Sequence, residues 1–399
     1  MRLAVMAGAL ALLATQAEAA TRWIGSWGAS PAPPLTTAAA GRPTSPSFNG
    51  QTVAQVVRLS AGGPRLRIRF SNEYGGKSLT LGAARVALVD GKGALVPGSE
   101  RTVTFAGAAS AAIPPGAPML SDPVALPTRA LGRLRISLYL PGDTGFCTCH
   151  FNGNEAAAIG QGDATPGAPN PAADYRAFLS GVEVEAAQPA RVVVAFGDSI
   201  TDGYRSTQGA NARWPDRLAE RLAAKYPGRP IGVVNAGIGG NRILSDGFIP
   251  PMGQSALTRF DRDVLAVPGV TDVVVLEGVN DLGMAGRGGT APSAEAMILG
   301  YRQLIERAHA RGLRIIGVTI LPYEGAGYYS PQGEAIRQTL NAWIRKPGNF
   351  DAMIDLDAVI RDPAKPTKMK TDLQSGDWLH PNDAGYRVMG DAVDLALFK

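Results

Sequence analysis

The chain is poor in the residues that most often reveal a function by composition. It has two cysteines and three histidines among 399 residues, and only 18% of its residues are charged. The cysteines, Cys147 and Cys149, cannot supply a disulfide framework, because a bridge between them would close a very short loop. With His150 they offer three possible metal ligands. A structural zinc site needs four and no second Cys/His cluster exists, so we expect no metal site.

Long runs of one residue type are also absent. No stretch of five or more Lys or Arg occurs, and the net charge is only +5, so nothing predicts a nucleic-acid partner. No apolar run reaches the roughly 20 residues of a membrane-spanning helix. The 49 Gly and 30 Pro residues follow no triplet period, which excludes a collagen-like chain. The 45% of hydrophobic residues suffices for a large core, and the length indicates two domains.

The start of the chain has the pattern of a secretory signal peptide. Arg2 supplies a basic residue, residues 3–13 are apolar, and residues 17–19 form a small-x-small cleavage site. A membrane anchor is the alternative, but the apolar run is too short to cross a bilayer. No cysteine precedes Cys147, which excludes a lipid-modified N-terminal cysteine. We therefore expect residues 1–19 to be removed and the mature protein to be periplasmic or secreted.

The region from residue 20 to residue 187 has the pattern of short strands separated by turns. Polar and apolar residues alternate most clearly at Arg65–Phe70, and further strands are expected at 52–59, 84–89 and 134–140. No segment keeps a 3.6-residue period over three helical turns. We therefore predict an all-β sandwich domain over residues 20–187.

After Arg191 the pattern changes to alternating strands and helices. Strands are expected at 192–196, 231–234, 272–276, 314–320 and 352–356, and helices at 214–226, 256–266, 293–310, 334–344 and 384–397. This order predicts an α/β domain over residues 188–399, with a parallel sheet covered by helices on both faces. Such sheets bind ligands at the carboxyl ends of their strands.

A serine stands where the first of these strands ends. Ser199 follows Gly197 and Asp198 at a strand-to-helix turn. Developing negative charge is favoured at a helix N-terminus, so the position suits a nucleophile. Serine is also a favoured N-cap residue, so the position of Ser199 by itself is equally consistent with a capping role.

Asp377 and His380 lie on an expected loop before the last helix. A serine nucleophile needs an adjacent base, and an imidazole base needs an acid that fixes its tautomer. An aspartate three residues before a histidine can supply that acid. The other histidines fit this role less well, because His309 lies in the charged last turn of a helix and His150 belongs to the β-rich region.

Two segments with Gly and Asn, 235–241 and 277–281, follow other strands of the same sheet. Backbone N–H groups of a Gly-rich turn and an Asn amide are suitable donors to an oxyanion. A dinucleotide-binding loop is the alternative for the Gly cluster. After Gly237 and Gly239 it would need a third Gly at position 242, where the chain has Arg242.

Taken in order, segments 196–199, 235–241, 278–281 and 377–381 resemble the four characteristic blocks of the SGNH, or GDSL-type, hydrolases. The resemblance covers about residues 190–399. It implies a flavodoxin-like α/β fold, preceded here by an all-β, jelly-roll-like sandwich domain. It also implies five site residues: Ser199 as nucleophile and N–H donor, Gly240 as backbone oxyanion donor, Asn280 as side-chain oxyanion donor, His380 as base and Asp377 as its acid. Gly239 takes the place of Gly240 if the alignment shifts by one.

Segments 23–27, 213–215 and 277–281, together with the β-rich front, resemble a two-domain bacterial branch that includes acetylxylan-esterase-like proteins. This implies a serine esterase that removes short acyl groups, often acetyl, from a polysaccharide such as xylan, without a metal or organic cofactor. The front domain would shape one wall of the cleft or bind glycan. A general carboxylesterase or lipase, an acyltransferase and a non-catalytic glycan-binding protein are the alternatives.

Other residues near these segments have simpler interpretations. Three acidic residues are expected to serve turns and helix caps: Asp198, Asp202 and Asp281. Glu277 is expected to make a buried structural hydrogen bond. Trp214 and Trp378 would line a pocket or, more commonly for such residues, pack in the core.

Overall fold

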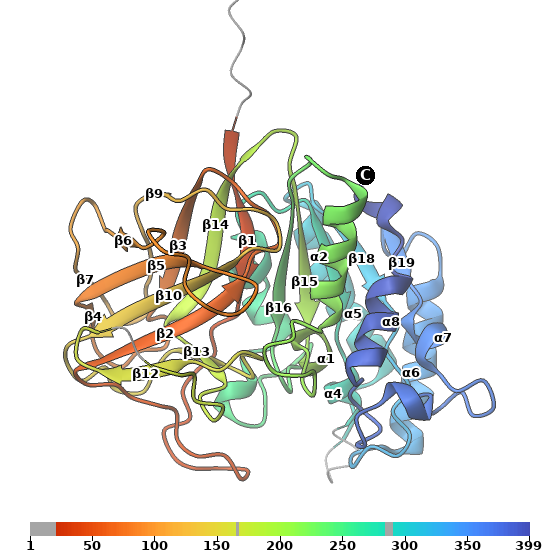
Figure 1. Ribbon diagram of the computed structural model, residues 1–399. Coiled ribbons are helices and arrows are strands. Elements are labelled where there is room, and N and C mark those ends of the chain that lie inside the picture. Colours follow the sequence, from red (N-terminus) through yellow and green to blue (C-terminus); the bar gives the residue numbers. More distant parts are fainter. Residues whose placement is uncertain (1–20, 165–166, 284–289) are drawn as a thin grey trace, which may run out of the picture.

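The computed structural model describes residues 21–164, 167–283 and 290–399 (Figure 1). The expected signal peptide lies outside the described residues. Within those three ranges, no helix combines the length and apolar character needed to cross a membrane.

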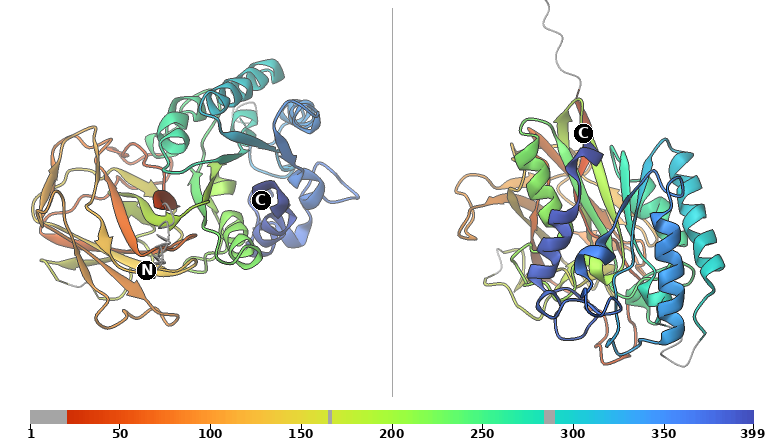
Figure 2. Two further views of the ribbon diagram at one scale, coloured as in Figure 1. Left: turned by 90° about the horizontal axis from the view of Figure 1, so that it is seen from above. Right: turned by 90° about the vertical axis from the view of Figure 1, so that its right-hand side faces the viewer.

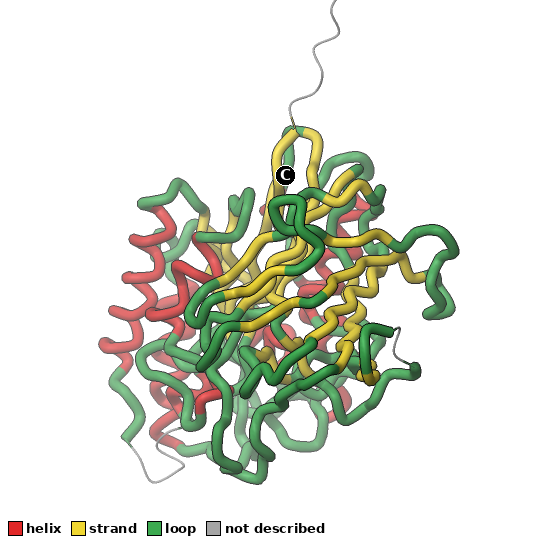
Figure 3. The backbone as a smooth tube through the Cα atoms, turned by 90° about the vertical axis from the view of Figure 1, so that its left-hand side faces the viewer, coloured by secondary structure: helices red, strands yellow, loops and turns green. Residues whose placement is uncertain are grey.

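The front half contains two five-stranded antiparallel sheets. The first comprises β1 (Thr21–Gly28), β14 (Leu179–Ala187), β3 (Arg65–Ser71) and β8 (Pro118–Leu120), with β9 (Val124–Ala125) also paired to β3. The second runs β12 (Ala158–Gln161), β2 (Gln51–Arg58), β10 (Arg133–Leu140), β5 (Ala83–Val89) and β6 (Arg101–Val103). Two short pairs complete this half: β4 (Leu79–Leu81) with β7 (Ala111–Ile113), and β11 (Cys149–Phe151) with β13 (Tyr175–Ala177). Figure 3 shows these strands, with the helices of the other half beyond them.

Buried apolar residues alternate with less buried polar residues along the strands, and this pattern explains how the sheets form a core. Leu66, Ile68 and Phe70 of β3 are fully buried, whereas the arginines between them are not. Leu134, Ile136 and Leu138 of β10 are likewise fully buried. A period of two places all such residues on one face of a strand. The strands predicted from this alternation are therefore present, each within one residue of the expected limits.

The second half is built on a five-stranded parallel sheet. Its spatial order is β16 (Ile231–Gly237), β15 (Arg191–Gly197), β17 (Asp272–Leu276), β18 (Arg314–Val318) and β19 (Ala352–Ile354). Counted along the chain from β15, this is the 2-1-3-4-5 order of flavodoxin-like sheets, which change direction of winding between β15 and β17. The predicted α/β fold with a parallel sheet is confirmed. Ligands of such folds bind at the carboxyl ends of the strands beside this point.

Helices lie on both faces of the parallel sheet (Figure 2). The longer ones are α2 (Trp214–Lys225), α5 (Ala294–His309), α6 (Pro331–Arg345) and α8 (Asp383–Ala392). The shorter ones are α1 (Ser199–Asp202), α3 (Ala256–Phe260), α4 (Val279–Leu282) and α7 (Leu356–Ile360), with a π-helical turn at Asp261–Leu265 and 3₁₀ turns at Pro250–Met252, Thr371–Leu373 and Leu395–Phe398. Among the longer helices, α2 packs against α8 and α5 packs against α6.

The last helix and the last strand end earlier than the sequence indicates, as does the strand expected over 314–320, which ends at Val318. The last helix was expected over 384–397 but ends at Ala392, because Asp394 caps a separate 3₁₀ turn by accepting a hydrogen bond from Ala396 N. The last strand was expected over 352–356 but ends at Ile354, because Asp355 caps α7 through Ala358 N. In both places a local side-chain cap replaces the longer element.

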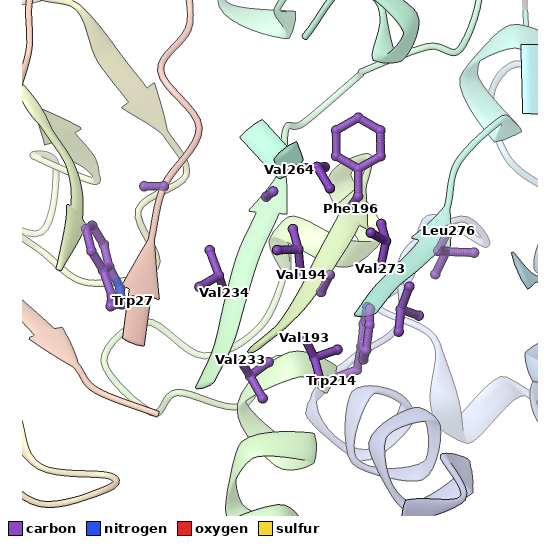
Figure 4. Packing of buried hydrophobic residues seen from close by; sticks show 14 of the residues in the cluster. Trp27, Val193, Val194, Phe196, Trp214, Val233, Val234, Val264, Val273 and Leu276 are labelled. Atoms are coloured by element: carbon purple, nitrogen blue, oxygen red, sulfur yellow. The ribbon is translucent and has the colours of Figure 1, made fainter. Parts of the chain in front are cut away.

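The two halves pack directly on each other through β1 and β16. Gly25 N donates a hydrogen bond to the carbonyl of Pro268 (2.8 Å), and a Cβ on Gly28 would lie only 2.6 Å from Cγ1 of Val234. Val233 N donates to Oγ of Ser60 (2.8 Å). Figure 4 shows Val234 on β16 in a row with buried valines of β15 and β17. One continuous buried apolar cluster therefore extends through both halves.

Candidate active site

Ser199 lies at the turn between β15 and α1. Gly197 ends the strand beside the Thr201 hydroxyl and the Leu276 carbonyl, where a side chain would not fit. Asp198 caps the helix by accepting a hydrogen bond from Ile200 N (2.9 Å), as predicted for that residue. Ser199 is the first residue of α1, so its own N–H has no acceptor within the helix. The sharp turn thus presents both the hydroxyl and the N–H of Ser199 at the sheet edge.

Ser199, His380 and Asp377 form a continuous hydrogen-bonded chain. Ser199 Oγ lies 2.8 Å from His380 Nε2, and His380 Nδ1 lies 2.7 Å from Asp377 Oδ2. The serine and histidine are 5% and 7% exposed. Because a carboxylate only accepts hydrogen bonds, Asp377 assigns the proton to Nδ1 and leaves Nε2 to accept from the serine hydroxyl. The structure brings together the three side chains that the sequence assigned to nucleophile, base and acid.

Asp377 is held in its charged form. Burial opposes its ionisation, but hydrogen bonds from the His380 ring and from the backbone N–H groups of His380 (2.9 Å) and Leu379 (3.0 Å) lower the pKa of Asp377 well below its usual range. The ring of Tyr204 packs edge-on against the imidazole, with centroids 4.7 Å apart. These contacts fix the ring in the orientation that a general base requires.

The predicted oxyanion donors lie on the two neighbouring strand ends. Gly240 has φ +81°, and a Cβ there would be 2.7 Å from Cγ of Met252, so only glycine fits this turn. No described residue accepts a hydrogen bond from its N–H. Asn280 donates one amide hydrogen from Nδ2 to the carbonyl of Asn241 (2.9 Å), which leaves the second amide hydrogen for a substrate oxygen. The geometry is compatible with the predicted donor roles.

A buried arginine that the sequence analysis did not single out lies beneath these segments. Arg259 is 1% exposed and donates to the carbonyls of Gly197 (2.8 Å) and Ala236 (2.7 Å) at the ends of β15 and β16. It also binds Asn241 Oδ1 (2.8 Å), Asp263 Oδ2 (3.0 Å) and Glu277 Oε1 (3.3 Å). Arg259 therefore joins the first two strand ends of the site. The expected buried hydrogen bond of Glu277 is this ion pair.

Buried carboxyl groups surround the base of the site. Burial, and then the nearby Asp198, raises the pKa of Glu277 well above its usual range. Burial raises the pKa of Asp281 to about 6, although two backbone N–H bonds oppose the shift. The raised pKa of Glu277 reduces the negative charge that this carboxyl group adds beside a developing oxyanion.

Two of the three predicted capping aspartates have other roles. Asp281 accepts hydrogen bonds from Ile243 N (2.9 Å) and Leu244 N (3.3 Å), and so holds the chain that follows the Gly-rich turn. Asp202 is the last residue of α1, and its Oδ1 lies 3.0 Å from Nε2 of His150 in the front half. Neither side chain caps a helix, because each is buried against a distant segment.

The remaining candidates have structural positions. Cys147 and Cys149 form a disulfide, and among the described residues no group of three or more His, Cys, Asp or Glu side chains could hold a metal ion. Trp214 is 1% exposed and belongs to the core. Trp378 is half-buried on the loop of Asp377 and His380, with Lys368 Nζ 4.7 Å from its ring centroid.

The second half of the chain is similar to known proteins. Residues 195–388 match the model of the GDSL-like Lipase/Acylhydrolase family. Similar solved structures include the acetyl xylan esterase AlAXEase (25% identity, 50% of this chain and 96% of that chain, TM-score 0.39). A lipase/acylhydrolase from Enterococcus faecalis is 22% identical, over 51% of this chain and 92% of that chain, with a TM-score of 0.38. A GDSL-like lipase from Bacteroides thetaiotaomicron VPI-5482 is 21% identical, over 53% of this chain and 91% of that chain, with a TM-score of 0.38. Among curated proteins, none matches significantly.

Proposed function

Residues 195–388 form a GDSL-like lipase/acylhydrolase domain, and from this premise we propose that the chain is a serine esterase that removes short acyl groups from a carbohydrate. The observation that carries the proposal is the hydrogen-bonded chain from Ser199 through His380 to Asp377. A serine, a histidine and a buried acid in this order activate a hydroxyl for attack on an ester carbonyl.

Acyl transfer to water then takes two steps. Ser199 Oγ forms a bond to the ester carbonyl carbon while His380 Nε2 takes the hydroxyl proton, and the carbonyl oxygen becomes an oxyanion. The N–H groups of Ser199 and Gly240 and the amide of Asn280 stabilise that charge. When the intermediate collapses, the alcohol leaves with the proton from His380. Water then attacks the acyl carbon while His380 takes one of its protons. The bond from the acyl carbon to Ser199 Oγ breaks, Ser199 Oγ takes that proton from His380, and the acid is released.

Packing beside the oxyanion donors supports a small acyl group. Met252 fills the space next to Gly240, and Nδ2 of Asn152, from the front half, would lie 2.7 Å from a Cβ on Gly239. This close packing leaves little space beside the two glycines. Half-buried aromatic rings at the site, Tyr204 and Trp378, support a sugar as the alcohol part, because rings of this kind stack on the apolar faces of sugars.

The proposed location is the periplasm or the cell exterior of a bacterium. Two observations support it: the signal-peptide pattern of residues 1–19 and the disulfide between Cys147 and Cys149. Disulfides persist in oxidising compartments. We also propose that the front half is a separate jelly-roll-like sandwich domain, and its two antiparallel sheets support this.

The proposal is tested with p-nitrophenyl acetate, a long-chain p-nitrophenyl ester and acetylated xylan. We expect wild type to cleave the acetyl substrates and prefer them to the long-chain ester, and Ser199→Ala to cleave none. Ser110→Ala, at an exposed position of the front half, serves as the control with wild-type rates. Equal activity of Ser199→Ala would contradict the proposal. Product analysis with an added alcohol acceptor distinguishes hydrolysis from acyl transfer.

A further inference from the structure

His150 of the front half makes hydrogen bonds through both ring nitrogens. It lies on β11, and its side chain is buried, with 6% of the residue exposed. Nδ1 is 2.9 Å from the carbonyl oxygen of Ser30, and Nε2 is 3.0 Å from Oδ1 of Asp202. The first partner belongs to the front half and the second to the helix that carries Ser199. His150 therefore connects the front half to the turn of the nucleophile.

These partners determine how many protons the pair carries. A carbonyl oxygen only accepts hydrogen bonds, so Nδ1 of His150 must carry a hydrogen. A second hydrogen must lie between Nε2 and Asp202 Oδ1, because two lone pairs do not attract each other at this distance. Whether that hydrogen resides on the ring or on the carboxyl group, the sum of the two charges is zero. The pair is therefore neutral as a unit.

Asp202 is close to the reacting serine along the chain. It is the fourth residue of the one-turn helix that begins at Ser199, and residues three apart on a helix are neighbours. Its N–H donates to the carbonyl of Asp198 (2.9 Å), and its carbonyl accepts from Nδ2 of Asn154 (3.1 Å). The backbone N–H of Asp202 is thus held by the turn of Ser199, and its carbonyl is held by Asn154 of the front half.

Among the described residues, His150 alone donates a side-chain hydrogen bond to the carboxylate of Asp202. Asp202 is 1% exposed, and its Oδ2 has no hydrogen-bond partner there. The arginine that acts on Asp202 electrostatically is Arg213, and both carboxylate oxygens of Asp216 already accept from its guanidinium (2.6 and 3.2 Å). Without His150, Asp202 would be a buried carboxylate with no neutralising partner.

We propose that His150 is a positioning residue for the esterase reaction: it holds Asp202 as a neutral pair, fixes the turn of Ser199, and keeps uncompensated negative charge away from the oxyanion. The inference rests on the proposed function, since it concerns the transition state of the same reaction. It assigns to the front half a part of the catalytic arrangement that segment 195–388 does not contain.

The test compares His150→Leu, Asp202→Asn and the double variant in the full-length chain, with p-nitrophenyl acetate as substrate. In His150→Leu, kcat should fall about 10- to 100-fold, because an unpaired charge on the helix that begins at Ser199 opposes formation of the oxyanion. KM should stay within about threefold, since both side chains are buried from solvent. Asp202→Asn should keep most of kcat, because its amide can donate to the unprotonated Nε2.

The double variant separates electrostatics from packing. If His150 acts by neutralising Asp202, adding Asp202→Asn to His150→Leu should recover at least about fivefold in kcat, since the charge is gone. A merely structural role predicts no such recovery, and its absence would overturn the proposal. His309→Leu is the matched control. It breaks a similar pair with Asp351 (3.0 Å), more exposed and at the opposite edge of the sheet, and should have wild-type kinetics.

Two further comparisons distinguish a failure of the His150 proposal from a variant that does not fold and from a failure of the proposed function. If His150→Leu does not fold, His150→Gln replaces it in the same comparison, and wild-type kcat in that variant would overturn the proposal. If wild type cleaves esters, Ser199→Ala does not, and His150→Leu keeps wild-type kcat, only the positioning role fails. If wild type cleaves no ester, the proposed function fails before His150 is tested.

Discussion

The phenol oxygen of Tyr328 lies 3.1 Å from Oδ1 of Asn280. The other end of that amide is also fixed, because Nδ2 donates to the carbonyl of Asn241, which can only accept. Oδ1 must then face Tyr328, and the phenol must be the donor. Tyr328 thereby holds the Asn280 amide with its free hydrogen directed away from both partners, as an oxyanion donor requires.

Tyr328→Phe removes this donor and keeps the ring. We expect kcat for p-nitrophenyl acetate to fall about 3- to 10-fold, which corresponds to one hydrogen bond, while KM changes little. Tyr329→Phe is the control, since its hydroxyl makes no hydrogen bond with the described residues. Steady-state kinetics of both variants decide the matter, and identical kcat values for Tyr328→Phe and wild type would count against a positioning role.

Asn280→Ala removes the side-chain oxyanion donor itself. Loss of one such donor costs about 100- to 1000-fold in kcat, more than the loss of Tyr328. Asn349→Ala, whose amide donates to the carbonyl of Trp343 (2.7 Å) at the opposite edge of the sheet, should behave as wild type. Full activity of Asn280→Ala in a direct kinetic comparison would show that another group stabilises the oxyanion.

Arg259→Lys tests the buried connection between the strand ends. All five N–H groups of the guanidinium donate to separate acceptors, and an ammonium group cannot reach them all. We expect the free energy of unfolding to drop by about 3 kcal/mol. Arg217→Lys, on the surface beside Asp391, should lose less than about 1 kcal/mol. Urea denaturation of the two variants provides the comparison, and equal losses would refute the role of Arg259.

Asp281→Asn tests the pH dependence of stability. Burial raises the folded-state pKa of Asp281 from its ordinary value of about 4 to about 6, so between these pH values the folded chain keeps a proton that the unfolded chain has lost. The resulting stabilisation is complete below about pH 4 and disappears as the pH rises through 6, a change of the order of 3 kcal/mol. The variant lacks this titration. The free energy of unfolding of wild type, relative to that of Asp281→Asn, should therefore fall between pH 4 and pH 7, as measured by urea denaturation. A difference that does not change with pH would contradict the raised pKa of Asp281.

Much of the catalytic half could be predicted because its signals are local. The continuous apolar run at 272–276 and the amphipathic pattern at 214–226 both correspond to observed elements. Ser199 and His380 were found because short motifs place them at strand and loop ends. The three-residue strand β11 has no such signal, since its pairing with β13 depends on the fold around it.

His150 and Arg259 were missed for a different reason. Their partners lie far along the chain, 52 residues from His150 to Asp202 and 62 from Arg259 to Gly197. Charged and polar residues are usually exposed, so a sequence alone gives no reason to bury them. From the sequence, His150 is considered only as a metal ligand or as a catalytic base, and nothing in the sequence indicates its contact with Asp202.

The contact of β1 with β16 has a consequence for solubility. β16 is an outer strand of the parallel sheet, and its outer edge is covered by Gly25 of β1 and by the Ser60 hydroxyl, which accepts from Val233 N. An uncovered apolar strand edge is a template for pairing with other chains. The catalytic half expressed alone would expose that edge and its valines, and we expect it to aggregate whatever its chemistry. The front half therefore also protects the catalytic half against self-association, and its removal would abolish that protection.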